Sequence, residues 1–228
     1  MSRLSPEEII DQISGACSGT WLRNYVKSKL RTDPLYEAVV AEMAPVPGPL
    51  LDVGCGVGLL GCYLRLCGWE GRVTGVDFDK RKIKQGRELA ERLELDGLQL
   101  ATGNAEDLLQ EQGGSVAILD VLQYLTEDNQ KRLLEKTLQG VSTDGKIIIR
   151  SGIFEDSRRF RVTKLGDWVG KLTFWMKERP VHYPTQEFFH EVFARNGFGC
   201  EITPLWGNTP FNNYLIVGRN QNFEGSNA

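Results

Sequence analysis

Short apolar runs alternate with helix-patterned segments along residues 50–150, and this alternation limits the possible folds more than any other feature of the sequence. A short apolar run bounded by turn residues is typical of a buried strand. Strands that alternate with helices form parallel sheets, because a parallel connection needs a crossover segment. Strands are expected at residues 50–53, 72–77, 98–103, 116–120 and 145–150, and the helices between them at 58–67, 79–95 and 126–139.

The alternation stops near the C-terminus. A helix is expected over residues 185–196, followed by strands at 200–205 and 214–218 with no helix between them. Two such neighbouring strands pair antiparallel. The predicted fold class is α/β, a doubly wound, mostly parallel seven-stranded sheet of Rossmann-like type. It carries a C-terminal antiparallel strand pair, a helical N-terminal extension and a helical lid insertion.

Charge and composition give no sign of several kinds of partner. The 27 basic and 30 acidic residues leave a net charge of −3, which gives no reason to expect nucleic-acid binding. No segment approaches the ~20 apolar residues of a membrane span, and the N-terminus lacks a signal-peptide pattern. We expect a cytoplasmic protein with no membrane span. The five cysteines form no CxxC pair and no cluster of metal ligands is recognisable, so no metal is expected.

The stretch LLDVGCGVGL places Gly54, Gly56 and Gly58 directly after the first strand. Three glycines in one turn cost stability unless the backbone needs a positive φ or a ligand lies against it. The turn also satisfies the GxGxxG fingerprint, so an NAD(P)-dependent oxidoreductase is an alternative function. Asp52 precedes the first glycine by two positions, where a carboxylate would attract a ligand that carries an ammonium or sulfonium group.

Acidic or amide residues follow the first four strands, at the sheet edge where open parallel sheets bind ligands. Asp77 closes the second strand, where its carboxylate suits the two hydroxyls of a ribose, although it could equally be a helix N-cap. Ala105 and Glu106 follow the third strand, where a backbone N–H and a carboxylate can read the edge of an adenine. Asp120 follows the fourth strand.

Five motifs in order make the sequence similar to the class I S-adenosylmethionine-dependent methyltransferases: LLDVGCGVG, VTGVDFD, GNAEDL, AILDVLQYL and GKIIIRSG. The resemblance implies that the cofactor is S-adenosyl-L-methionine, released as S-adenosyl-L-homocysteine. The glycine turn would hold its methionyl part, and Asp77 its ribose. Ala105 and Glu106 would hold the adenine, with Phe78 packed on its face. Asp120 would lie beneath the methionyl group or the acceptor.

The same resemblance divides the chain into parts. The expected parts are a helical N-terminal cap at 1–44, a methyltransferase domain at 45–219 with a lid insertion at about 153–184, and a disordered tail at 220–228. The stretch KLRTDPLY, together with the first motif, resembles methyltransferases of bacterial aryl-polyene and polyketide pigment pathways. That likeness implies an aromatic or acyl acceptor, either a free small molecule or one tethered to a carrier. The sequence leaves the oligomeric state open.

Two segments are candidates for building the acceptor pocket. The first is the helical region at residues 21–43. The second, at 160–176, predicts an amphipathic helix rich in aromatic residues, which is either a lid over the acceptor or ordinary core. The pocket residues expected are Trp21, Tyr25, Gln123, Tyr124, Trp168 and Tyr183.

His182 is the candidate catalytic residue, because its loop can present a general base near the transferred methyl group. His190 is expected to be exposed and without a role. Gln123 stands where phenol and quinone methyltransferases often have a histidine, and it can orient a substrate but cannot take its proton. The predicted function is methyl transfer to a small apolar or aromatic acceptor, by O-methylation of a phenol, hydroxyl or carboxyl group. The alternatives are the oxidoreductase and a non-catalytic cofactor-binding protein.

Overall fold

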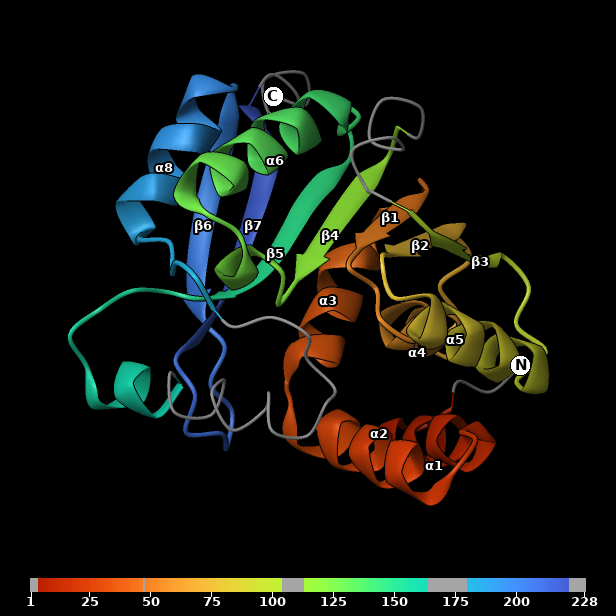
Figure 1. The fold of residues 1–228 in the computed structure, drawn as a ribbon. Coiled ribbons are helices and arrows are strands. Elements are labelled where there is room, and N and C mark those ends of the chain that lie inside the picture. The colour runs from red at the N-terminus through yellow and green to blue at the C-terminus, as the bar shows by residue number, and fades with distance from the viewer. Residues whose placement is uncertain (1–3, 47, 104–112, 164–179, 222–228) are drawn as a thin grey trace. The chain divides into compact units, whose positions relative to one another are not determined.

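The computed structural model describes residues 4–46, 48–103, 113–163 and 180–221 (Figure 1). The chain divides into two compact units, residues 1–108 and residues 109–228. In the first unit three helices precede strands that alternate with helices, whereas the second unit ends in two consecutive strands with no helix between them.

The first unit begins with three helices, the expected N-terminal extension. They are α1 (Pro6–Ala16), α2 (Thr20–Thr32) and α3 (Leu35–Met43). A capping box starts α1, in which Ser5 accepts from the Glu8 N–H while the Glu8 carboxylate accepts from the Ser5 N–H. Figure 1 shows α1 and α2 packed side by side. The Asp33 carboxylate accepts from the Leu35 N–H at 3.2 Å, which fixes the entry into α3.

Three parallel strands follow in the first unit, in the order β3-β2-β1. The elements are β1 (Leu50–Val53), α4 (Leu59–Leu66), β2 (Val73–Asp77), α5 (Lys80–Arg92) and β3 (Leu98–Thr102). Every residue of β1 and β2 is buried, as expected for parallel strands covered on both faces. Helix α4 approaches the strands closely at Gly61, where a Cβ would lie 2.5 Å from Leu98 Cδ1.

The second unit contains four strands in the order β4-β5-β7-β6. Strands β4 and β5 are parallel, and β7 pairs antiparallel with both β5 and β6. Figure 1 shows α6 and α8 side by side over these strands. The elements are β4 (Ser115–Leu119), the 3₁₀ turn η2 (Leu122–Tyr124), α6 (Glu127–Gly140), β5 (Lys146–Gly152), α8 (Gln186–Arg195), β6 (Phe198–Pro204) and β7 (Asn213–Asn220).

The seven strands found in the described residues confirm the predicted fold class, with its parallel pairs followed by an antiparallel pair. Thr126 is the N-cap of α6 as expected, although its side chain makes no capping bond, whereas Thr185 caps α8 by accepting from the Phe188 N–H. Most of the predicted lid helix, including Trp168, lies outside the described residues, as does most of the predicted tail. No helix in the described part of the chain is both long and apolar enough to cross a membrane.

Candidate functional site

The turn after β1 needs its glycines for backbone conformation. Gly54, Gly56 and Gly58 have φ values of +73°, +59° and +73°. Residues that carry a side chain rarely adopt this left-handed backbone conformation. A Cβ at Gly58 would also lie 2.9 Å from Leu100 Cδ1, so β3 packs against this part of the turn. A Cβ at Gly56 would have no atom within 4 Å. The backbone of Gly56 is therefore open to a ligand, whereas Gly58 is enclosed by protein.

Asp77 ties the end of β2 to the glycine turn. Its Oδ2 accepts from the Gly56 N–H at 2.9 Å, and its Oδ1 accepts from the Asp79 N–H at 2.8 Å. The N-cap of α5 is Asp79, which accepts from the Arg81 N–H, so the alternative role of Asp77 as that N-cap is wrong. Each carboxylate oxygen of Asp77 retains a second lone pair. The group can therefore brace the turn and still accept from two ligand hydroxyls.

Asp52 lies within β1 and is 3% exposed. Burial, and to a smaller extent the nearby Asp77 carboxylate, together raise the pKa of its carboxyl group to about 7. None of the described residues donates a hydrogen bond to this carboxylate. A buried carboxylate without a donor is costly when ionised, and a cationic group placed next to it would remove that cost. The turn thus offers an approachable backbone together with a site suited to a ligand cation.

Of the remaining cofactor residues predicted in the first unit, the structure describes one. Phe78 follows Asp77 and is 64% exposed. Ala105 and Glu106 lie outside the described residues.

In the second unit, Asp120 directly follows β4 in the left-handed region, with a φ of +60°. Its carboxylate pairs with the guanidinium of Arg150 on β5, through a bond from Nε to Oδ1 at 2.6 Å and a second from Nη2 to Oδ2. The Asp120 N–H also donates to the Arg150 carbonyl at 3.0 Å. Arg150 is 5% exposed, and sequence reasoning missed it. The available signal was a charged residue within the apolar run IIIRSG, since a buried charge needs a partner.

Gln123 lies in η2 and is 5% exposed. Its main-chain carbonyl accepts from the N–H groups of Val181 and His182, at 2.7 and 3.3 Å. Its side-chain Oε1 is buried and has no hydrogen-bond partner among the described residues. Gln123 therefore anchors the segment that carries His182 through its backbone, and leaves its side-chain carbonyl unused.

His182 is held against α6 by Gln130, a second residue that sequence reasoning missed. Gln130 is completely buried, and its Nε2 donates to the carbonyls of Leu122 and His182 at 2.8 and 2.9 Å. The Gln130 Oε1 lies 3.4 Å from His182 Nδ1, and the Glu127 Oε2 lies 3.7 Å from His182 Nε2. The histidine ring is half-exposed, whereas His190 is exposed as expected.

Other predicted pocket residues form aromatic contacts within each unit. The Tyr183 ring packs edge-to-face on Phe160, with centroids 5.0 Å apart. Tyr124 is half-buried in η2. In the first unit, Trp21 stacks on Tyr25 with centroids 5.4 Å apart, and Trp21 is 49% exposed. The structure thus groups Gln123, Tyr183 and His182 in one unit, and Trp21 with Tyr25 in the other.

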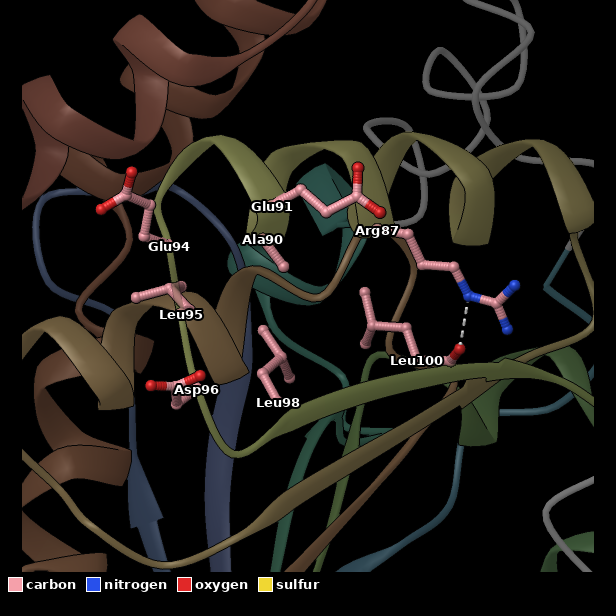
Figure 2. A pocket seen from close by; sticks show the side chains of 8 residues that line it. All are labelled: Arg87, Ala90, Glu91, Glu94, Leu95, Asp96, Leu98 and Leu100. Carbon is pink, nitrogen blue, oxygen red and sulfur yellow. Dashed lines mark hydrogen bonds between the residues drawn. The ribbon is translucent and has the colours of Figure 1, made fainter.

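A pocket of about 520 Å³ lies between α5 and β3 in the first unit (Figure 2). Figure 2 shows Arg87 Nε donating to the Leu100 carbonyl, at 2.8 Å. The lining residues are Arg87, Ala90, Glu91, Glu94, Leu95, Asp96, Leu98 and Leu100. None of the described residues predicted to bind cofactor or acceptor lines this pocket. Among the described residues, no group of three or more His, Cys, Asp or Glu side chains is arranged to hold a metal ion.

A family model described as a methyltransferase domain matches residues 48–172, more than half of the chain. The chain belongs to the methyltransferase-domain family. This membership confirms the resemblance drawn from the five motifs and disfavours the oxidoreductase alternative. Two solved structures of similar fold, both of one magnesium protoporphyrin IX methyltransferase, contain bound S-adenosyl-L-homocysteine and S-adenosyl-L-methionine, the pair predicted here from the motifs.

Two curated relatives are methyltransferases of different kinds. The chain is 39% identical over 59 residues to a ribosomal RNA small subunit methyltransferase G of Methylobacillus flagellatus. It is 26% identical over 172 residues to a demethylmenaquinone methyltransferase of Oceanobacillus iheyensis. These matches cover 26% and 65% of this chain, and 29% and 68% of the two relatives.

Solved structures with the same fold include two small-molecule enzymes. Magnesium protoporphyrin IX methyltransferase from Synechocystis PCC 6803, with bound SAH, is 16% identical with a TM-score of 0.62, over 95% of this chain and 94% of that one. Mitomycin 7-O-methyltransferase is 16% identical with a TM-score of 0.67, over 87% of this chain and 56% of that one. At these identities the similarity shows the fold.

Proposed function

We propose that this methyltransferase transfers the methyl group of S-adenosyl-L-methionine to a small apolar or aromatic acceptor, by O-methylation of a phenol, hydroxyl or carboxyl group. The acceptor is either free or tethered to a carrier, and the reaction takes place in the cytoplasm. Similarity in fold to mitomycin 7-O-methyltransferase and to magnesium protoporphyrin IX methyltransferase supports a small-molecule acceptor.

The observation that carries the proposal is the buried Asp52 carboxylate beside an open glycine turn. Asp52 has no donor among the described residues, and the Gly56 backbone faces open space. The methionyl part of the cofactor carries an ammonium group, which fits next to this carboxylate. Asp77 keeps free lone pairs for the ribose hydroxyls. The residues present therefore fit the cofactor.

The other cofactor contacts follow the order of the motifs. Phe78 stacks on the adenine, and Ala105 and Glu106 bind its polar edge. Gly54 and Gly58 give the turn its shape, and Asp120 borders the methionyl side. Residues 1–44 act as a cap on a methyltransferase domain at 45–219.

The acceptor side is assigned to the aromatic residues and to the group around η2. Trp21, Tyr25, Tyr124, Trp168 and Tyr183 form apolar walls for the acceptor. His182 takes the proton that a hydroxyl acceptor releases, and the contact between its Nδ1 and Gln130 orients its ring. When bound, the cofactor supplies a methyl group activated by its sulfonium, which leaves with S-adenosyl-L-homocysteine as the other product.

Calorimetry with S-adenosyl-L-methionine, S-adenosyl-L-homocysteine and NAD tests the cofactor part of the proposal. We expect micromolar binding of the first two ligands, no binding of NAD, and weaker binding to Asp52→Asn, which keeps the shape of the side chain and removes its charge. A preference for NAD would refute the proposal.

Mass spectrometry of pooled small molecules tests the reaction itself. Incubation with the cofactor should give products that have gained one methyl group. A protein that binds the cofactor but methylates nothing in broad pools would be a binding protein instead.

A further inference from the structure

The second unit contains two buried glutamines whose side-chain amides are used very differently. The Nε2 of Gln130 donates to three main-chain carbonyls, those of Leu122, Leu125 and His182, and its Oε1 lies 3.4 Å from His182 Nδ1. Gln123 is similarly enclosed, at 5% exposure, yet its Oε1 has no partner within the described part of the chain. The fold therefore provides hydrogen-bond partners for the side-chain amide of Gln130, but none of the described residues provides one for the Oε1 of Gln123.

A buried carbonyl without a donor destabilises the folded protein, so it calls for an explanation. Packing does not require a glutamine at position 123, because methionine has a similar length and shape without the polar atoms. The backbone of Gln123 already performs the structural task of the position, by accepting from the N–H groups of Val181 and His182. The described residues thus give the side-chain carbonyl no structural task and no donor.

The location identifies the ligand. Gln123 lies three residues after Asp120, in the turn beyond the carboxyl end of β4. Open α/β sheets bind their ligands beyond the carboxyl ends of the strands. The neighbouring segment carries His182 and Tyr183, both assigned above to the acceptor. The group that meets Gln123 is therefore a part of the acceptor.

We infer that the Gln123 Oε1 accepts a hydrogen bond from an uncharged hydroxyl group of the methyl acceptor, and so selects hydroxyl acceptors over carboxylates and thiolates. This inference rests on the proposed function and narrows it. A carboxylate or thiolate presents only lone pairs, and these repel the lone pairs of the glutamine carbonyl. A hydroxyl satisfies the carbonyl and turns its own lone pair toward the methyl group.

Gln123 acts here as an orienting group and takes no proton. The O–CH₃ bond forms as the bond between methyl and sulfur breaks, and the sulfur retains that electron pair. The hydroxyl proton leaves to His182 or to water. The net change is one methyl gained by the oxygen and one proton released.

Melting of the ligand-free protein tests whether the carbonyl is unsatisfied, with Gln130 as the matched control. We expect Gln123→Met to melt at the same temperature as the wild type or above it, because it removes an unpaired polar group. Gln130→Met should melt several degrees lower, because it breaks bonds that the fold uses. A comparable loss in both variants would show that Gln123 is structural and would overturn the inference.

Binding of matched aromatic probes to the protein saturated with S-adenosyl-L-homocysteine tests the selectivity. The probes are 2-naphthol, naphthalene, 2-naphthoate and 2-naphthalenethiol, which share one ring system. We expect wild type to bind 2-naphthol about tenfold or more tightly than the other three, and Gln123→Met to reduce this preference to about twofold.

The outcomes separate the inference from the proposed function. If S-adenosyl-L-homocysteine binds but 2-naphthol binds no better than naphthalene or 2-naphthoate, the selectivity assigned to Gln123 is wrong. If S-adenosyl-L-homocysteine does not bind, the proposed function fails, and the melting comparison alone then decides whether the Gln123 carbonyl is unsatisfied.

Discussion

The Asp77 Oδ2 accepts a hydrogen bond from the Gly56 N–H at 2.9 Å, although the two residues are 21 positions apart in the chain. This bond joins the end of β2 to the turn that follows β1. The carboxylate proposed to bind the ribose therefore also fixes the backbone proposed to hold the methionyl part. A substitution at Asp77 is therefore expected to affect both of these proposed contacts.

Asp77→Asn should weaken binding of S-adenosyl-L-methionine by at least about tenfold, because an amide N–H₂ replaces one of the two accepting oxygens. The new N–H₂ group then faces the backbone N–H of either Gly56 or Asp79, and two donors cannot form a hydrogen bond with each other. Asp79→Asn is the control, since asparagine is an equally good N-cap and should leave affinity within about twofold. Calorimetry on both variants measures the difference. Equal affinities of wild type and Asp77→Asn would contradict the ribose assignment.

Asp52 should make stability fall with rising pH. Its folded pKa is about 7, raised from 3.8, so between these values the folded protein keeps a proton that the unfolded chain has released. The loss of stability is complete above pH 7 and reaches up to about 4 kcal/mol. Asp52→Asn should therefore be more stable than wild type at pH 8 and similar to it near pH 4. Urea unfolding at the two pH values measures this, and a variant less stable at pH 8 would refute it.

The same carboxylate should make cofactor binding depend on pH in the opposite direction. An ammonium group is attracted to Asp52 only when that residue is ionised, so affinity should rise as pH increases through about 7. Asp52→Asn should bind weakly and lose this rise. Calorimetry between pH 6 and pH 8 distinguishes the two profiles. A wild-type affinity that does not change across this range would show that the Asp52 carboxylate does not interact with the ammonium group of the cofactor.

The sequence predicted the fold well because local patterning determines most of it. Apolar runs and their spacing located all seven strands of the described residues, with boundaries that differ by at most two residues. Strand β5 extends to Gly152, beyond the predicted end at residue 150, because Ser151 and Gly152 pair with Tyr214 and Asn213 of β7. That extension comes from tertiary pairing, which a local pattern does not contain.

The candidate site residues could be predicted only where they belong to a recognisable sequence motif. The glycine turn and Asp77 lie in motifs with fixed spacing, so their neighbourhood could be expected from the sequence. Arg150 and Gln130 were missed, because their partners Asp120 and His182 lie 30 and 52 positions away. Which distant side chains meet depends on how strands and loops assemble, and no short-range pattern records it.

Gly58→Ala should destabilise the protein more than Gly56→Ala. Both positions have a positive φ, which costs an alanine about 1–2 kcal/mol, but only at Gly58 would the new methyl group also press on Leu100. Gly56→Ala places its methyl group in open space on the proposed ligand side, so its larger effect should be on cofactor binding. Urea unfolding and calorimetry measure the two effects. The opposite ranking in both measurements would show that the open side of the turn faces something other than the cofactor.

His182→Ala should lower kcat by roughly a hundredfold with little change in KM, because a general base acts in the transition state and adds little to ground-state binding. The Gln130 Oε1 near Nδ1 favours the tautomer with its proton on Nδ1, which leaves a lone pair on Nε2. The Nε2 lone pair is the proton acceptor in this assignment, and the Glu127 Oε2 lies 3.7 Å from that nitrogen. The wild-type rate should therefore fall at acid pH, and this fall should disappear in His182→Ala.

His190→Ala is the matched control, because this exposed histidine on α8 was expected to have no role and should keep the wild-type rate and pH profile. Methyl incorporation into an accepted substrate, followed across pH in all three proteins, measures the difference. A His182→Ala enzyme with the wild-type kcat would show that water takes the proton. His182 would then serve only to hold its loop against α6 through its main-chain bonds to Gln123 and Gln130.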